Sequence, residues 1–133
     1  MSVERPTAAT ATVLVVDDDQ AVREGLAAIL EGVGYTVLVA DTFERGRDVL
    51  RTAGPDLLIV DVRLGDFNGL QLLATSVSPI RAIVLTGYAD SALERDARQM
   101  GAEYLVKPVT RAQLLELVAH QLHSAAPPPP ARL

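Results

Sequence analysis

The stretch VLVVDDDQAVR (Val13–Arg23) places four aliphatic residues directly before three consecutive aspartates. Short, continuous aliphatic runs of this kind are typical of strands that are buried on both faces of a parallel sheet. Adjacent carboxylates repel one another, and the repulsion grows as folding excludes water. The stretch therefore predicts a buried strand whose acidic end needs a cation or a proton from elsewhere.

Four further runs follow at regular intervals along the chain, and residues with helical spacing separate them. The five predicted strands are Thr12–Val16, Thr36–Ala40, Leu57–Val60, Ala82–Leu85 and Tyr104–Val106. Strands that alternate with helices pair in parallel and are covered by helices on both faces. The sequence therefore predicts an α/β fold, a (βα)5 doubly wound parallel five-stranded sheet.

Capping residues and glycines predict where the intervening helices begin and end. The first helix carries an apolar stripe from Val22 to Val33 and ends at Gly34. The third helix is expected to start near Asn68 and to stop at Pro79. The other expected caps are Thr42 for the second helix, Ser91 with Glu94 for the fourth, and Thr110 with Gln113 for the fifth.

The length of 133 residues suits a single domain, which we place at residues 12–123. We expect residues 1–11 to be a flexible N-terminal segment, and residues 124–133, with four consecutive prolines, to be a disordered tail or linker. The net charge of −5 and the scattered basic residues argue against direct nucleic-acid binding or attachment to a membrane surface. No apolar run approaches the roughly 18 residues of a membrane span, so a cytoplasmic protein is predicted.

The residues that follow the predicted strands are the candidates for chemistry, because ligands bind at the carboxyl ends of parallel strands. These residues are Asp17 and Asp18 after the first strand, Asp61 after the third, Thr86 after the fourth and Lys107 after the fifth. Each has an ordinary explanation as a turn residue or a solvated charge, but their convergence on one edge favours a site. Three carboxylates suit Mg²⁺, and a lysine with a hydroxyl can bind phosphoryl oxygens. We therefore predict phosphoryl transfer to a carboxylate.

Four segments carry a resemblance to a known family: VLVVDDD, LLIVDVRLGDFNGL, IVLTGY and YLVKPV. In this order and at strand ends they resemble the response-regulator receiver domain of bacterial two-component signalling, from Thr12 to Leu122. The resemblance implies a flavodoxin-like fold like that of CheY. It implies a phosphoprotein in which Asp61 accepts a phosphoryl group from a histidine kinase, a phosphotransfer protein or a small donor such as acetyl phosphate. Such a protein is regulatory rather than an enzyme, although it promotes its own phosphorylation and dephosphorylation.

The resemblance also implies a role for each site residue. Asp18 and Asp61 would bind Mg²⁺ or Mn²⁺, Asp17 would act mainly through water, and the backbone carbonyl of Arg63 would complete the ligands. Asp19 would cap the first helix, and the Lys107–Pro108 peptide bond would be cis. Thr86 and Tyr104 would form a switch in which the aromatic ring changes rotamer as the hydroxyl moves toward the phosphoryl group. That switch would act on the surface made by the fourth helix, the fifth strand and the fifth helix.

Two features distinguish this chain within the family pattern. Arg63 and Tyr88 occupy positions that tune the lifetime of the phosphoryl group, and both are large enough to hinder an attacking water. Gly65 stands where many receivers have proline, so we expect a looser loop there.

Several alternatives stay open. The chain could be a receiver-like interaction module that is not phosphorylated, or the receiver of a longer transcriptional regulator. A small-molecule phosphotransferase is disfavoured, because Arg63 stands where such enzymes carry a second aspartate. The partner would be a sensor kinase or phosphotransfer protein, with a downstream target or a second copy on the switch surface.

Overall fold

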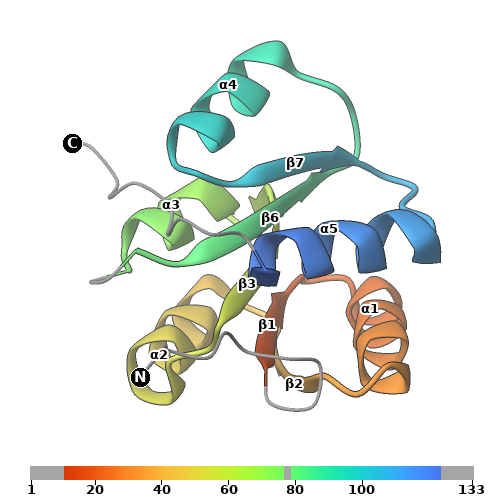
Figure 1. Ribbon diagram of the computed structural model, residues 1–133. Helices are drawn as coiled ribbons and strands as arrows, with labels where there is room; N and C mark the ends of the chain where they lie inside the picture. Colours follow the sequence, from red (N-terminus) through yellow and green to blue (C-terminus); the bar gives the residue numbers. More distant parts are fainter. Residues whose placement is uncertain (1–10, 77–78, 124–133) are drawn as a thin grey trace, which may run out of the picture.

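The computed structural model describes residues 11–76 and 79–123 (Figure 1). Both predicted flexible ends therefore lie wholly or almost wholly outside the described residues, and their flexibility stays a prediction. The elements, in chain order, are β1 (Thr12–Val16), α1 (Gln20–Gly32), β2 (Thr36–Ala40), α2 (Phe43–Ala53), β3 (Leu57–Asp61), β4 (Arg63–Leu64), β5 (Phe67–Asn68), α3 (Gly69–Ala74), β6 (Arg81–Thr86), α4 (Ser91–Gln99), β7 (Glu103–Val106) and α5 (Arg111–His123).

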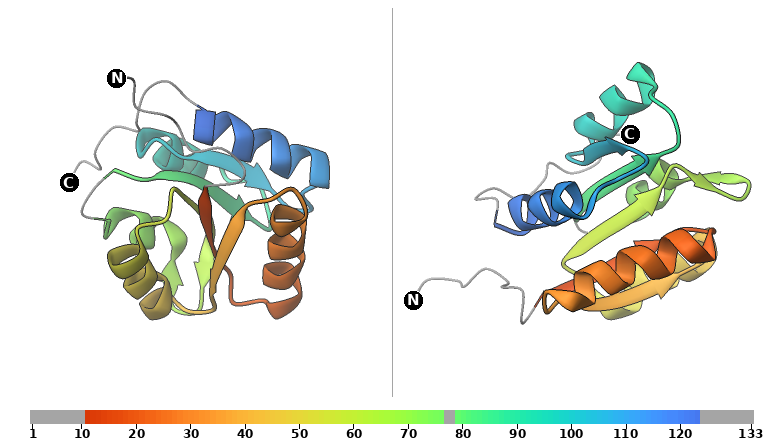
Figure 2. Two further views of the ribbon diagram at one scale, coloured as in Figure 1. Left: turned by 60° about the horizontal axis from the view of Figure 1, so that its bottom comes forward. Right: turned by 90° about the vertical axis from the view of Figure 1, so that its right-hand side faces the viewer.

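A five-stranded parallel sheet forms the centre of the fold, with the strand order β2-β1-β3-β6-β7. Helices α2, α3 and α4 cover one face, where their apolar side chains pack with residues such as Leu14 and Leu58. Helices α1 and α5 cover the other face, around Val15 and Ile59 (Figure 2). The predicted doubly wound α/β fold is confirmed. Burial on both faces explains the aliphatic runs of β1, β3 and β6, whereas the edge strands β2 and β7 are only partly buried.

Several predicted helix boundaries are confirmed by hydrogen bonds. The Asp19 carboxylate accepts from the amide of Val22 at 3.1 Å, and the Thr42 hydroxyl oxygen accepts from that of Arg45 at 3.2 Å. Thr110 and Gln113 bond to each other's amides at 3.1 and 3.0 Å, which completes the capping box of α5. The Lys107–Pro108 peptide bond is cis, as the resemblance implied.

Two predicted boundaries are wrong. Helix α4 is capped by Asp90, whose carboxylate accepts from the amides of Ala92 and Leu93 at 2.9 and 3.1 Å, while Ser91 is already helical. A carboxylate is as good a cap as a hydroxyl, and its charge also interacts favourably with the helix dipole. Helix α3 ends at Ala74 rather than at Pro79, because the Thr75 hydroxyl and amide both donate to the carbonyl of Leu72 and close the last turn.

The segment after β3 is a small hairpin, which the sequence analysis did not predict. Strands β4 and β5 pair antiparallel, with Arg63 opposite Asn68 and Leu64 opposite Phe67. Gly65 occupies the turn with a φ of 59°, a conformation that disfavours side chains with a Cβ atom. The ring of Phe67 stacks on that of Phe43, with 4.4 Å between centroids. The structure thus differs from the loose loop expected from Gly65, because the glycine makes a paired turn possible here.

None of the helices within the described ranges is long and apolar enough to span a membrane.

Candidate functional site

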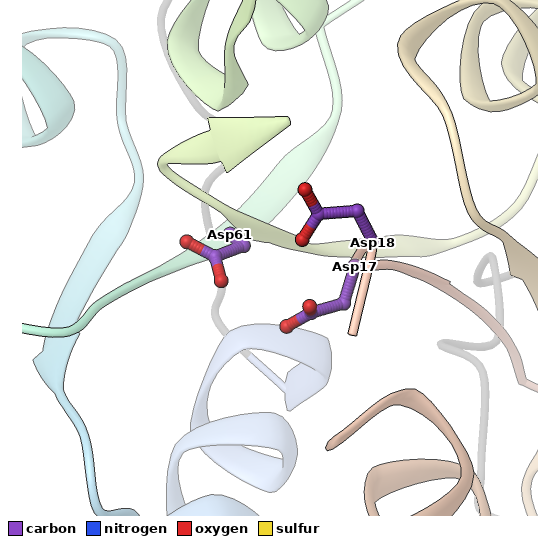
Figure 3. A group of neighbouring side chains, drawn as sticks. All are labelled: Asp17, Asp18 and Asp61. Carbon is purple, nitrogen blue, oxygen red and sulfur yellow. The ribbon is translucent and has the colours of Figure 1, made fainter. Parts of the chain in front are cut away.

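Three carboxylates meet at the carboxyl edge of the sheet, as predicted. Asp17 and Asp18 directly follow β1, and Asp61 is the last residue of the neighbouring strand β3. One oxygen from each lies within 4.8 Å of the others (Figure 3). Asp17 and Asp61 are buried and Asp18 is exposed, so the cluster opens to solvent on one side. A set of hard oxygen donors with an open side fits a Mg²⁺ ion that keeps several waters.

Asp17 is the most enclosed of the three carboxylates, with 1% of its surface exposed. Its Oδ1 atom accepts from the amide of Asp19 at 2.9 Å, and its own amide donates to the carbonyl of Ala40 at 3.2 Å. Burial raises the pKa of Asp17 above its usual range, and the nearby charge of Asp61 adds to this effect. The amide of Asp19 and the charge of Lys107 oppose the rise in pKa without cancelling it.

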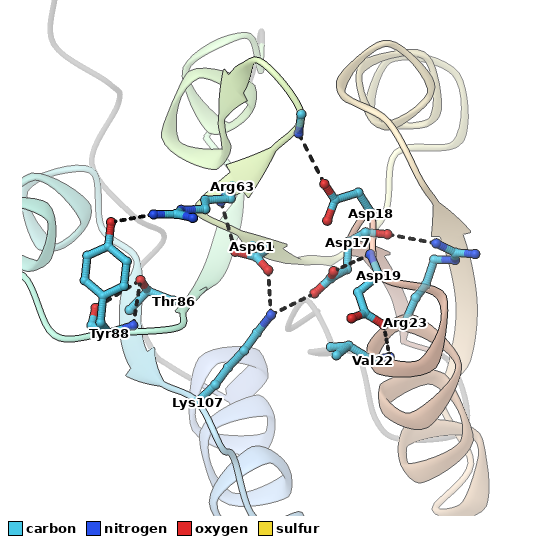
Figure 4. Close-up of polar contacts among 11 residues, drawn as sticks. Asp17, Asp18, Asp19, Val22, Arg23, Asp61, Arg63, Thr86, Tyr88 and Lys107 are labelled. Atoms are coloured by element: carbon cyan, nitrogen blue, oxygen red, sulfur yellow. Dashed lines mark hydrogen bonds and ion pairs between the residues drawn. The ribbon is translucent and has the colours of Figure 1, made fainter.

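Lys107, from the end of β7, supplies the positive charge of the site. Its ammonium donates to Asp17 Oδ2 at 3.2 Å and to Asp61 Oδ2 (Figure 4). Partial burial alone lowers the pKa of Lys107, but the hydrogen bonds and charges of both carboxylates outweigh it, so the pKa is raised. The ammonium is charged at neutral pH and bridges the two carboxylates, which reduces their mutual repulsion.

Thr86 and Tyr104 lie on the adjacent strands β6 and β7, and both are buried. The Thr86 hydroxyl donates to the carbonyl of Tyr88 at 3.1 Å. The Tyr104 hydroxyl oxygen accepts from the amide of Asp90 at 3.1 Å, at the start of α4. The aromatic ring is thus inside the fold and is connected to α4, while the Thr86 hydroxyl is bonded within the loop that follows β6.

Arg63 and Tyr88 form a pair at the rim of the site. The Arg63 guanidinium donates to the Tyr88 hydroxyl at 2.9 Å and lies 5.2 Å from the ring centroid. Arg63 also touches the central carboxylate, because its backbone amide donates to Asp61 Oδ1 at 2.9 Å. The pKa of Arg63 is raised, chiefly by the hydrogen bond to Tyr88. The structure therefore brings together the two residues that the sequence analysis assigned to phosphoryl lifetime.

Two residues beside the site were missed by the sequence analysis. The amide of Gly69, at the start of α3, donates to the carbonyl of Val62 at 2.7 Å. A Cβ atom on Gly69 would lie 2.2 Å from the carbonyl oxygen of Asp61, so only glycine fits there. The second residue is Arg23, whose guanidinium donates to the carbonyl of Asp17 at 2.9 Å. A glycine at a helix start and an arginine on a helix are common, so neither carried a signal in the sequence.

Comparison with known proteins agrees with this arrangement. A model of the response regulator receiver domain matches residues 13–119. The chain belongs to this family. It is 34% identical to the photosynthetic apparatus regulatory protein RegA of Rhodobacter capsulatus, over 90% of this chain and 66% of that protein. It is 36% identical to the KDP operon transcriptional regulatory protein KdpE of Escherichia coli, over 88% of this chain and 54% of that protein. This receiver chain therefore spans between half and two thirds of the length of these two relatives.

Solved receiver structures share the fold. A CheY-like response regulator receiver domain protein from Methanospirillum hungatei JF-1 has 32% sequence identity and a TM-score of 0.79, covering 84% of this chain and 93% of that one. The BeF3-activated N-terminal receiver domain of Klebsiella pneumoniae RstA has 25% identity and a TM-score of 0.77, covering 85% of this receiver and 99% of that chain. The fold and the two-component regulatory class of the chain are thus confirmed.

Replacing Asp17 with asparagine is expected to stabilise the metal-free receiver at neutral pH, because the cost of burying the Asp17 charge outweighs the contacts of that charge with Asp19 and Lys107. The raised pKa of Asp17 means that the folded state holds its proton more strongly than the unfolded state. That linkage lowers the stability of the wild type as pH rises above the ordinary value of 3.8. The difference in unfolding free energy should therefore vanish below about pH 3.8 and reach its maximum at neutral pH. Urea unfolding in EDTA across this pH range measures it, and a less stable variant at pH 7 would contradict the prediction.

Proposed function

We propose that this receiver accepts a phosphoryl group on Asp61 in a Mg²⁺- or Mn²⁺-dependent reaction. The donor is a phosphohistidine of a sensor kinase or phosphotransfer protein, or a small acyl phosphate. The observation that carries the proposal is the position of Asp61 at the end of β3, where it is bonded to the ammonium of Lys107 and grouped with the carboxylates of Asp17 and Asp18. This arrangement places a carboxylate beside a positive charge and beside groups that bind phosphoryl oxygens.

In the proposed reaction an Asp61 carboxylate oxygen attacks the phosphorus atom. The bond from phosphorus to the imidazole nitrogen of the donor breaks, and its electron pair stays on the imidazole. Lys107 exchanges its hydrogen bond to Asp61 for one to a phosphoryl oxygen, and the Thr86 hydroxyl turns from the carbonyl of Tyr88 to another. Asp17, Asp18, Asp61 and the carbonyl of Arg63 would hold the metal ion, which when bound offsets the negative charge of the carboxylates and the phosphoryl group.

The proposed output is a shift of the α4–β7–α5 surface. Turning of the Thr86 hydroxyl breaks its bond within the loop that leads to α4, and Tyr104 contacts the residue that caps α4. Phosphorylation would therefore bias the position of α4 as a population shift. We infer that this surface binds a downstream protein or a second copy of the receiver in the cytoplasm.

A second possibility concerns the rest of the protein. RegA and KdpE are regulatory proteins of which this chain spans 66% and 54%. This favours a receiver within a longer transcriptional regulator over a receiver that acts alone. Dimerisation on activation with beryllofluoride, measured by light scattering, would support a regulator that pairs through its receiver. A monomer under the same conditions would favour a protein that transfers its phosphoryl group or binds a separate target.

The phosphoacceptor is tested with Asp61→Asn. The wild type is expected to gain the mass of one phosphoryl group on incubation with acetyl phosphate and Mg²⁺, and to lose this gain in EDTA. Asp61→Asn should gain none, because an amide is not nucleophilic enough to replace the carboxylate. Asp66→Asn is the matched control, since Asp66 is exposed on the neighbouring hairpin and lies outside the carboxylate cluster. Labelling that persists in Asp61→Asn would contradict the assignment of the acceptor.

Self-dephosphorylation is expected to be slow, because the Arg63–Tyr88 pair at the rim limits the approach of water to Asp61. Arg63→Asn and Tyr88→Ala should each speed hydrolysis several-fold. In the double variant, the increase in the hydrolysis rate should be smaller than the product of the two single increases, because either single change breaks the same hydrogen bond. Loss of the phosphoryl mass after removal of acetyl phosphate gives the rates, and rates equal to the wild type would refute the idea.

A further inference from the structure

Arg23 is a partly buried basic residue beside the carboxylates, and no step of the proposed reaction uses it. It lies one turn into α1, and its guanidinium donates to the backbone carbonyl of Asp17 at 2.9 Å. In Figure 4, Arg23 and Lys107 approach Asp17 from opposite sides. Lys107 binds the carboxylate of Asp17, whereas Arg23 binds its backbone.

The contact of Arg23 completes the hydrogen bonding of Asp17. The amide of Asp17 bonds to Ala40, and the two carboxylate oxygens bond to Asp19 and Lys107. Its carbonyl is the remaining polar group, and it belongs to a residue that is only 1% exposed. Loss of a donor to a buried carbonyl leaves that group unpaired, and a rotation of its peptide toward another partner would relieve the cost.

The peptide unit that Arg23 holds is the one that joins Asp17 to Asp18. Rotation of this unit changes the direction of both side chains, because it lies between their two Cα atoms. We propose that Arg23 is a positioning residue for the cation site, which acts by fixing the orientation of the Asp17–Asp18 peptide. This inference rests on the proposed function, because it assumes that these carboxylates bind the divalent cation.

A role through charge alone would have the opposite effect on cation binding. A guanidinium beside the site repels a divalent cation, so its removal would tighten binding if electrostatic repulsion were the only effect. Positioning predicts weaker binding on removal, as for the groups that orient the ligands of other metal sites. The sign of the change therefore distinguishes the two roles.

The test is titration of MgCl₂ into the ¹⁵N-labelled full chain, followed through the amide resonances of Asp19 and Gly65, which contact the two carboxylates. Arg23→Gln is expected to raise the Mg²⁺ dissociation constant about tenfold. Arg23→Lys keeps the charge but not the planar donor group, so it should raise the constant only about threefold. Phosphorylation of Arg23→Gln by acetyl phosphate should need more Mg²⁺ but reach the wild-type extent at saturation.

Arg51→Gln is the control for the loss of one positive charge. Arg51 is exposed in the last turn of α2, which lies at the opposite end of the sheet from the site. The Mg²⁺ affinity of the Arg51→Gln variant should equal that of the wild type. Binding by Arg23→Gln that is as tight as that of Arg51→Gln, or tighter, overturns the proposal. If Arg23→Gln does not fold, the Arg23→Lys titration is the test. A Mg²⁺ dissociation constant of Arg23→Lys that is equal to or lower than that of Arg51→Gln then overturns the proposal.

The same experiment separates this inference from the proposed function. A wild type that neither binds Mg²⁺ nor is phosphorylated refutes both. A wild type that does both, alongside an Arg23→Gln variant with unchanged Mg²⁺ affinity, refutes only the role of Arg23.

Discussion

Gly69→Ala is expected to lower the free energy of unfolding by about 1–3 kcal/mol and to reduce the phosphorylation of Asp61 strongly. The added methyl group would lie 2.2 Å from the carbonyl oxygen of Asp61 and 3.0 Å from a methyl group of Val60. The nearest atom belongs to the backbone of β3, so no rotation of a side chain relieves the contact. Either α3 or the end of β3 has to move, and movement of β3 would displace Asp61, the proposed phosphoacceptor.

Gly25→Ala is the matched control for Gly69→Ala. Gly25 is exposed within α1, and a Cβ atom there meets nothing within 4 Å. The same substitution should therefore stabilise the protein there by up to about 1 kcal/mol, because alanine favours a helix over glycine. Urea unfolding measures both changes, and acetyl phosphate labelling reports on the site. A Gly69→Ala variant as stable and as readily phosphorylated as the wild type would show that α3 packs less closely than described.

Lys107→Met is expected to slow the phosphorylation of Asp61 by about 10²–10³-fold, the usual cost of removing one donor that stabilises transition-state charge. The methionine keeps an unbranched side chain that is one heavy atom shorter, and it lacks the ammonium that bridges Asp17 and Asp61. The metal-free variant should also be less stable at neutral pH, because the two carboxylates lose their counter-charge. The raised pKa of Lys107 means that this stabilisation persists from neutral pH to about pH 10.5 and is lost as pH rises further through the raised pKa.

The composition of the chain makes a second test of this lysine possible. Lys107 is the only lysine among the 133 residues, so an amine acylating reagent has one side-chain target besides the N-terminus. Acylation should proceed slowly in the native protein, because the ammonium is held by two carboxylates, and it should abolish phosphorylation. Lys107→Arg keeps the charge without the compact point-like donor, so it should recover only part of the rate. A wild-type phosphorylation rate in Lys107→Met would contradict the role of the ammonium.

The positions of the candidate site residues could be predicted because they follow from the strand pattern. Asp17, Asp61, Thr86 and Lys107 each lie at or just past the carboxyl end of a strand of the central sheet. Parallel strands bring such ends to one edge whatever the details of packing. The caps formed by Asp19, Thr42 and Thr110 were also predictable, since a cap is made within a few residues of its own helix.

Contacts between distant segments could not be predicted in this way. The bond from the Gly65 amide to Asp18 and the stacking of Phe67 on Phe43 join residues far apart in the chain. The pairing of Arg63 with Tyr88 depends on the conformations of the β4–β5 hairpin and of the loop after β6, although each residue was a candidate by position. The cap of α4 was misassigned because Asp90 and Ser91 are adjacent and both suit that role.

The sequence by itself determined the order of the five helices and of the five strands of the central sheet, the edge of that sheet that carries the site, and the residue types gathered there. These follow from local periodicity and from the chirality of parallel α/β units, which leave few ways to arrange five buried strands. Only the tertiary structure decided how Asp17 is held by Lys107 and Arg23, why residue 69 has to be glycine, and where the Thr86 hydroxyl points. Those features depend on atomic distances between separate elements, and such distances are set by the packing of the whole domain.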